Sequence, residues 1–180
     1  MGGSGTDAKG HERESMKAAS LELIVRALLE AKVRYLVVGG IAVIAHGYVR
    51  LTVDVDLLIH LEPANVVAAL KALEGLGYRP TIPVTTEQFA DGALRERWVA
   101  EKQMKVLKLY SEAHRETTID VFVSDPLGFN DAYGRVVEQK LTDQLSVPVC
   151  GYEDLVKLKR LASRPKDLAD LEQLRKVRGE

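Results

Sequence analysis

The segment Thr52–His60 reads TVDVDLLIH and predicts a strand whose two faces differ in character. Side chains alternate between the faces of a strand, so Asp54 and Asp56 are expected on the same face. The apolar residues around them are expected to face the core, namely Val53, Val55 and Leu57. Two adjacent carboxylates repel each other, and a divalent cation between them removes that cost. The segment therefore predicts either a metal-binding strand face or a solvated face with two unrelated aspartates.

A third acid lies in a later apolar segment. Met104–Tyr110 and Thr117–Val123 both read as strands, and the polar turn between them predicts a hairpin. Asp120 lies in the second strand, although aspartate is depleted in strands. If this strand neighbours Thr52–His60, Asp120 adds a third carboxylate to the pair. Three carboxylates can hold two metal ions about 3.5–4 Å apart on a phosphoryl group, and Asp120 can also act as base on an attacking hydroxyl.

Two glycines follow the first predicted strand, Arg34–Val38. Glycine lets the backbone approach a phosphate closely, and a helix that begins there offers unpaired N–H groups. Ile41–His46 reads as such a short helix, with Gly47 as its terminator. A strand that ends in two glycines also makes an ordinary turn, so Gly39-Gly40 alone does not establish a phosphate site.

The remaining segments alternate between helical and strand patterns. Helices are expected at Lys17–Ala31, Pro63–Glu74, Gly151–Ala162 and Lys166–Val177. Strands are expected at Tyr78–Ile82, Val136–Leu141 and Ser146–Val149, with a loop or short helical turn at Pro126–Tyr133. The stretch Thr85–Lys102 carries no clear pattern. This order predicts one α/β (α+β) domain over residues 17–180, with a mixed sheet and C-terminal helices at 151–177, after a flexible leader at 1–16.

The amino-acid composition argues against several structural and functional classes of protein. The chain has 180 residues, of which 46% are hydrophobic, and 25 Lys and Arg balance 26 Asp and Glu. Global disorder, a membrane-spanning segment and a strongly basic nucleic-acid-binding surface are therefore not expected. Cys150 is the single cysteine, which excludes an internal disulfide and a cysteine-based zinc site. The leader has no apolar core, so it is not a signal peptide, and we expect a cytoplasmic protein.

The order and spacing of the three motifs resemble those of the nucleotidyltransferase superfamily that includes DNA polymerase beta. These motifs are Val38-Gly39-Gly40, Asp54-Val-Asp-Leu57 and Ile119-Asp-Val121. The segments Gly39–Ile59 and Tyr152–Leu171 are also similar to one branch, the abortive-infection and toxin–antitoxin nucleotidyltransferases. The resemblance spans about residues 35–174. It implies a mixed, mostly antiparallel sheet flanked by helices, with a C-terminal helix pair.

The resemblance also implies roles for individual residues. Asp54 and Asp56 would bind Mg²⁺, as one ion or two, and Asp120 would complete the metal site or activate the acceptor. The residues expected to meet the nucleotide phosphates are Gly39, Gly40, Arg50, Thr52, Lys159, Arg164, Lys166 and Asp167. Three of the surrounding residues have plainer explanations: a surface arginine for Arg50, a packing residue for His46, and a helix-dipole interaction for Asp167.

By resemblance, the protein would transfer a nucleoside monophosphate from an NTP to an acceptor hydroxyl and release pyrophosphate. The acceptor would be an RNA such as a tRNA 3′ end, a protein side chain or an aminoglycoside. A role as the toxin of a toxin–antitoxin or phage-defence system would add an antitoxin partner. Two alternatives stay open: a catalytically silent member that binds a nucleotide or a partner protein, and an interaction domain with aspartates on its surface.

Overall fold

The computed structural model describes the backbone of residues 5–180 and the side chains from Ala18 onward. Within this part, seven strands form one open sheet in the order β3-β4-β5-β2-β1-β7-β6. The strands are β1 (Tyr35–Val38), β2 (Asp54–Ile59), β3 (Arg79–Pro80), β4 (Val106–Tyr110), β5 (Thr118–Phe122), β6 (Val137–Thr142) and β7 (Leu145–Val149). The pairs β1·β7 and β2·β5 are parallel and the other neighbours are antiparallel. The predicted mixed, mostly antiparallel sheet is confirmed.

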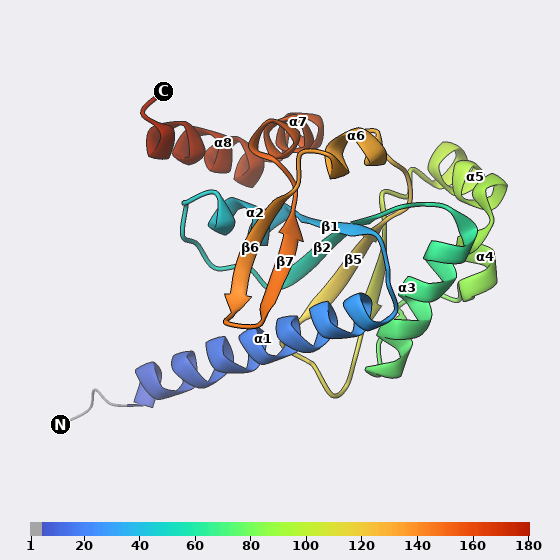
Figure 1. The fold of residues 1–180 in the computed structure, drawn as a ribbon, viewed down its shortest axis with the longest axis horizontal. Helices are drawn as coiled ribbons and strands as arrows, with labels where there is room; N and C mark the ends of the chain where they lie inside the picture. The colour runs from blue at the N-terminus through green and yellow to red at the C-terminus, as the bar shows by residue number, and fades with distance from the viewer. Residues whose placement is uncertain (1–4) are drawn as a thin grey trace.

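Helices flank this sheet on several sides (Figure 1). They are α1 (Gly5–Glu30), α2 (Gly39–Ala45), α3 (Pro63–Gly75), α4 (Thr86–Ala90), α5 (Gly92–Lys102), α6 (Phe129–Tyr133), α7 (Tyr152–Ala162) and α8 (Pro165–Arg178). In the view of Figure 1, α1 runs along the bottom, α3 to α5 lie at the right, and α7 and α8 lie together at the top. The predicted C-terminal helix pair is thus confirmed, and Ser163 and Arg164 separate α7 from α8.

The packing of the core explains why β2 presents its carboxylates on the face turned away from the core. Val55 and Leu57 of β2, and Ile119 and Val121 of β5, are all at most 2% exposed. They belong to one apolar cluster with residues of α1 and α3, among them Ile24, Leu28, Val66 and Leu73. Burial of each such side chain stabilises the fold by about 1.5–3 kcal/mol. The alternation of the strand then turns the even-numbered residues of β2 and β5 to the opposite face.

The prediction that Val53 faces the core is wrong. Val53 is 51% exposed, and β2 begins one residue later, at Asp54. The alternation therefore does not extend to Val53, which belongs to the loop that joins α2 to β2. Two other apolar residues of this loop, Val49 and Leu51, are 81% and 76% exposed.

The first helix is longer than predicted. It begins at Gly5 rather than at Lys17, so most of the predicted flexible leader is helical. Residues 1–4 lie outside the described part. Once a helix is nucleated, further residues add at low cost, and this segment contains several good helix formers. In the part of the chain that the structure describes, none of the helices is long and apolar enough to cross a membrane.

Two helices occupy the stretch 85–102, where no pattern was recognised. Thr85 caps α4 in a capping box, because its side chain accepts from the Gln88 N–H while the Gln88 side chain accepts from the Thr85 N–H. Asp91 caps α5 by accepting from the N–H groups of Ala93 and Leu94. These caps are local signals that define both helix starts. The strand expected at Tyr78–Ile82 is reduced to the two residues of β3.

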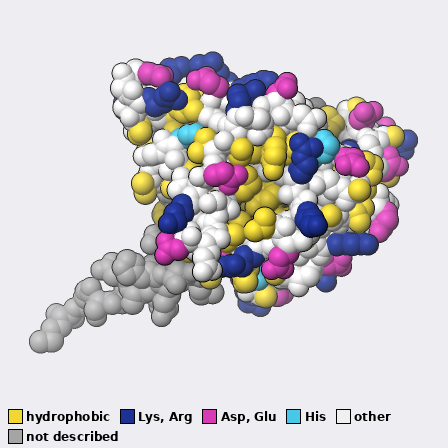
Figure 2. Space-filling model, viewed as in Figure 1, with side chains coloured by type: hydrophobic (Ala, Val, Ile, Leu, Met, Phe, Trp, Pro, Cys, Tyr) yellow, Lys and Arg dark blue, Asp and Glu magenta, His cyan; other side chains and the backbone are white. Residues whose placement is uncertain are grey.

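The molecular surface agrees with the near-zero net charge. Figure 2 shows positive and negative side chains interspersed around a central area of apolar side chains on the face in view. Mixed charge of this kind generates little long-range field of one sign. Local electrostatics within the candidate site therefore matter more than the charge of the whole molecule.

Candidate functional site

The register of the sheet brings the three predicted carboxylates together. Strands β2 and β5 are parallel neighbours, with Asp56 opposite Asp120 and Asp54 opposite Thr118. The condition set by the sequence, that the two acidic strands be neighbours, is therefore met. We call Asp54, Asp56 and Asp120 the acid row.

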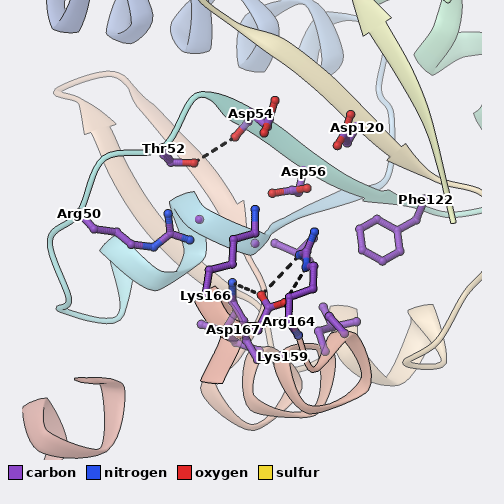
Figure 3. A pocket seen from close by; sticks show the side chains of 16 residues that line it. Arg50, Thr52, Asp54, Asp56, Asp120, Phe122, Lys159, Arg164, Lys166 and Asp167 are labelled. Carbon is purple, nitrogen blue, oxygen red and sulfur yellow. Dashed lines mark hydrogen bonds and ion pairs between the residues drawn. The ribbon is translucent and has the colours of Figure 1, made fainter. Parts of the chain in front are cut away.

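The acid row faces a cleft closed on its other side by α7 and the start of α8 (Figure 3). All eleven site residues predicted from the sequence line this central cleft. In Figure 3, the carboxylates project from the strands, while Lys159, Arg164 and Lys166 come from the helical side. The structure thus gathers these residues around one cavity, and the functions assigned to them remain predictions.

The two glycines are required by close packing against the site. Gly39 has a φ of +64°, and a Cβ atom there would lie 1.9 Å from Asp56 Oδ2. A Cβ atom on Gly40 would lie 2.3 Å from Thr52 Oγ1. The Gly40 N–H donates to the Asp56 carboxylate. Glycine at both positions therefore lets the start of α2 meet Asp56 and Thr52, while phosphate binding by these residues remains a prediction.

Asp56 is the member of the acid row whose pKa is raised. Burial raises the pKa of its carboxyl, and the charges of Asp120 and Asp54 raise it further, to about 6. The hydrogen bond from Gly40 opposes only part of this shift. Like-charge repulsion of this kind is typical of carboxylates collected for a functional purpose.

Asp54 is shifted in the opposite direction. Burial alone would raise the pKa of Asp54, but a hydrogen bond from the Thr118 hydroxyl and the nearby Lys108 ammonium bring it below its ordinary value. The two aspartates of the DVD motif therefore differ in their ease of ionisation. Asp54 is favoured as a carboxylate, whereas Asp56 is disfavoured.

Lys108 is a member of the site that the sequence did not indicate. It lies on β4 directly opposite Asp120, and its Nζ is 2.8 Å from Asp120 Oδ1 and 3.3 Å from Asp54 Oδ1. Burial lowers the pKa of Lys108, but the hydrogen bond and charge of Asp120 and the charge of Asp54 raise it above its ordinary value. In the sequence, the sign of this role is a lysine that alternates with two leucines in a predicted strand. Its meaning depends on the strand register, which places Lys108 opposite Asp120.

The donor set of the acid row fits a hard divalent cation such as Mg²⁺. All three side chains offer carboxylate oxygens, which Mg²⁺ prefers. Asp120 Oδ1 is buried, and the Lys108 ammonium is its ion-pair partner at 2.8 Å. From Ala18 onward, no three His, Cys, Asp or Glu side chains are grouped closely enough to form a ready metal site. The acid row thus has suitable ligands, with an ammonium group between two of them.

The helical wall of the cleft is held by a buried ionic network. Lys159 is 4% exposed, and its Nζ lies 3.0 Å from Asp167 Oδ1 and 2.7 Å from Asp170 Oδ2. Arg164 pairs with Asp167 at 2.7 Å, and Arg50 pairs with Asp170 at 2.8 Å. Removing one partner from a buried charge cluster leaves the others uncompensated. The network therefore joins α7, α8 and the loop before β2 into one wall.

The contacts of three residues bear on alternatives that the sequence left open. Arg50 is not a free surface arginine, because it is paired with a buried carboxylate of α8. Asp167 is fully buried between two cations, so its role exceeds a helix-dipole interaction. His46 Nε2 lies 2.8 Å from the carbonyl oxygen of Cys150, and its ring meets Tyr152 edge-on, which favours a packing role.

An apolar section completes the cleft and was also not predicted. Phe122 lies on β5 two residues after Asp120, and therefore on the same face. Phe122, Leu155, Leu158 and Ala162 line the cleft beside the charged groups. An aromatic ring at this position offers a flat surface for stacking. The cleft thus combines an acid row, a cationic wall and an apolar section.

Comparisons with known proteins add no family assignment. Neither a scan against protein-family models nor a search of curated proteins found a match to this chain. The residues of the central cleft are therefore the basis for inferring a function.

Proposed function

We propose that the protein is a Mg²⁺-dependent nucleotidyltransferase that moves a nucleoside monophosphate from an NTP to an acceptor hydroxyl. The observation that carries this proposal is the acid row itself, in which Asp56 and Asp120 from separate strands lie in register and face a wall of cations. Carboxylates opposite cations around one cleft suit a reaction in which a polyphosphate is held, neutralised and split.

The chemistry would proceed by displacement at the α-phosphorus. The acceptor oxygen forms a bond to that phosphorus, the bond to the bridging oxygen of the β-phosphate breaks, and pyrophosphate leaves. Mg²⁺ bound by the acid row would neutralise the phosphate oxygens and the leaving group. Asp120 would accept the proton of the acceptor hydroxyl.

The other residues of the cleft would bind and orient the nucleotide. Arg164 and Lys166 lie at the exposed side of the helical wall, and they would contact the β- and γ-phosphates. Phe122 and Leu158 would contact the nucleobase. Such positioning supplies much of the rate enhancement in phosphoryl transfer.

The test is a transfer assay that does not assume the acceptor. The protein is incubated with each α-³²P-labelled NTP and Mg²⁺, together with total tRNA, a bacterial protein extract or a set of aminoglycosides, and label transfer and pyrophosphate release are followed. We expect transfer by the wild type and none by Asp54→Ala. Asp143→Asn is the matched control, because this acid in the β6–β7 turn is 97% exposed and far from the cleft in sequence and topology. Equal inactivity of wild type and Asp54→Ala with every NTP and acceptor would refute the proposal.

A second candidate function is nucleotide binding without turnover. The specific observation in its favour is Lys108, whose ammonium already pairs with two of the three carboxylates. Calorimetric titration with NTP and Mg²⁺ separates the two functions, since binding with no pyrophosphate release supports the silent member. In the toxin–antitoxin setting suggested by the resemblance, either form would have a protein partner.

A further inference from the structure

We propose that the Lys108 ammonium occupies the cation position of the acid row when no metal is bound, and that a divalent cation displaces it. Lys108 is then a positioning residue that competes with metal for Asp54 and Asp120. This inference rests on the metal-binding part of the proposed function, and it concerns a residue of β4 to which the sequence motifs assign no role.

The placement of Lys108 follows from the sheet register. Lys108, Asp120 and Asp56 lie side by side on β4, β5 and β2. From its place opposite Asp120, the lysine side chain extends across β5 toward Asp54, and its Nζ is 3.5 Å from Thr118 Oγ1 on the way. The ammonium thus contacts one carboxylate on β5 and one on β2, as a cation bridging these two strands would.

Charge explains why the ammonium would be an incomplete substitute. Lys108 brings one positive charge to a row of three carboxylates, and its direct contacts go to Asp54 and Asp120. The cations Lys159, Arg164 and Lys166 act on the row from the helical wall. Asp56 receives no bond from Lys108, and its ionised form is disfavoured by burial and by the charges of both other acids. A divalent cation brings twice the charge and, once the three carboxylates turn toward it, would be held by all of them, so it would stabilise the ionised row better than the ammonium does.

The lysine side chain can also leave without disturbing the fold. The Lys108 side chain is 42% exposed, whereas its neighbours Leu107 and Leu109 are buried and hold β4 in the core. Its flexible four-carbon stem can move the ammonium into water, where solvation replaces the ion pairs. Displacement therefore needs a side-chain rotation and no rearrangement of the sheet.

The direct test is the chemical reactivity of Lys108 in the wild-type protein. The protein is treated with an amine-acetylating reagent, with EDTA or with saturating MgCl₂, and acetylation of each lysine is measured by quantitative mass spectrometry. We expect Mg²⁺ to raise the acetylation rate of Lys108 several-fold. Lys105, an exposed lysine just before β4, serves as the internal control and should not change. An unchanged Lys108 rate under conditions where calorimetry shows Mg²⁺ binding would overturn the proposal.

A second measurement uses the affinity for the metal. Lys108→Met removes the competing charge and keeps the length of the apolar stem, whereas Lys108→Arg keeps a cation. Loss of the competing ion pairs should tighten Mg²⁺ binding by about tenfold in Lys108→Met, as measured by calorimetry. Lys108→Arg should bind close to wild type. Equal or weaker binding by a folded Lys108→Met variant would overturn the proposal, as would absence of Mg²⁺ binding by both wild type and variant.

These readouts are independent of turnover. If Mg²⁺ exposes Lys108 but no acceptor is labelled, the displacement stands and the nucleotidyltransferase proposal fails. If transfer occurs while the reactivity of Lys108 ignores Mg²⁺, the enzyme proposal stands and the displacement fails. If Lys108→Met does not fold, the labelling experiment on the wild type decides alone.

Discussion

Replacing Asp56 by asparagine should stabilise the metal-free protein while removing a predicted metal ligand. Burial and the charges of Asp120 and Asp54 raise the pKa of Asp56 from 3.8 to about 6. A shift of about two units at about 1.4 kcal/mol each means that the ionised carboxylate costs the folded protein about 3 kcal/mol at neutral pH. Asparagine carries no charge and its side-chain oxygen can still accept from the Gly40 N–H. We therefore expect the free energy of unfolding of Asp56→Asn in EDTA at pH 7.5 to exceed that of the wild type by about 3 kcal/mol.

The pH dependence gives this prediction a definite sign. Because the folded-state pKa of Asp56 is above its unfolded value, the folded protein binds the extra proton between pH about 4 and 6. The stability contributed by Asp56 is therefore highest below this range and is lost as the pH rises through about 6. The advantage of Asp56→Asn over the wild type should be near zero at pH 4 and reach its full size above pH 6. Saturating Mg²⁺ should reduce the advantage, because the wild type alone then gains a full set of ligands.

Urea denaturation followed by the fluorescence of Trp98, the single tryptophan, measures these differences. Asp54→Asn is the matched control, because interactions with Thr118 and Lys108 bring the pKa of Asp54 below its ordinary value and its ionised form supports the fold. Its substitution should lower stability at neutral pH, the opposite sign. Two results would refute the reasoning: Asp56→Asn no more stable than wild type in EDTA, or an advantage that persists unchanged from pH 7 to pH 4.

Three further substitutions test other parts of the cleft. Gly39→Ala should destabilise the fold and abolish nucleotide binding, because the added Cβ meets the Asp56 carboxylate at a backbone with φ of +64°; thermal denaturation and calorimetry measure the two losses. Lys159→Met should cost about 3–5 kcal/mol of stability in urea denaturation by leaving two buried carboxylates short of a partner, whereas the exposed Lys157→Met should change little. Phe122→Ala should weaken NTP binding by about tenfold through lost stacking and leave Mg²⁺ binding unchanged, and equal NTP affinity would show that the base does not contact this ring.

The local part of this site was predictable from the sequence. Alternation within a strand depends only on neighbouring residues, so the shared face of Asp54 and Asp56 followed directly from the DVD pattern. The meeting of Asp120 with that pair was a conditional expectation, because it depends on which strands become neighbours. That β5 lies parallel to β2, with an antiparallel β4 on its other side, is a property of the whole sheet.

The missed residues share one physical reason. Lys108 matters through its register with Asp120, and the polar turn between β4 and β5 did not fix that register in advance. Asp170 matters through its ion pair with Arg50, which lies 120 residues earlier in the chain. Charges whose partners are distant in sequence are recognisable only after folding. The wrong prediction for Val53 has a different cause. The alternation of the strand was extended one residue beyond β2, to a residue that precedes its first one.

The charges around the cleft also restrict how a nucleotide can enter. Five carboxylates and five cations meet in and beside the cleft: Asp54, Asp56, Asp120, Asp167 and Asp170 against Arg50, Lys108, Lys159, Arg164 and Lys166. The cations of the ionic network are already committed to carboxylates that hold α8 in place. A triphosphate that entered alone would add several negative charges to a balanced site, and it would compete with those internal carboxylates for Lys159. A triphosphate that enters with divalent cations brings its own compensation, and displacement of Lys108 frees one further positive charge near the acid row. Nucleotide and metal should therefore bind as linked ligands, each raising the affinity of the other.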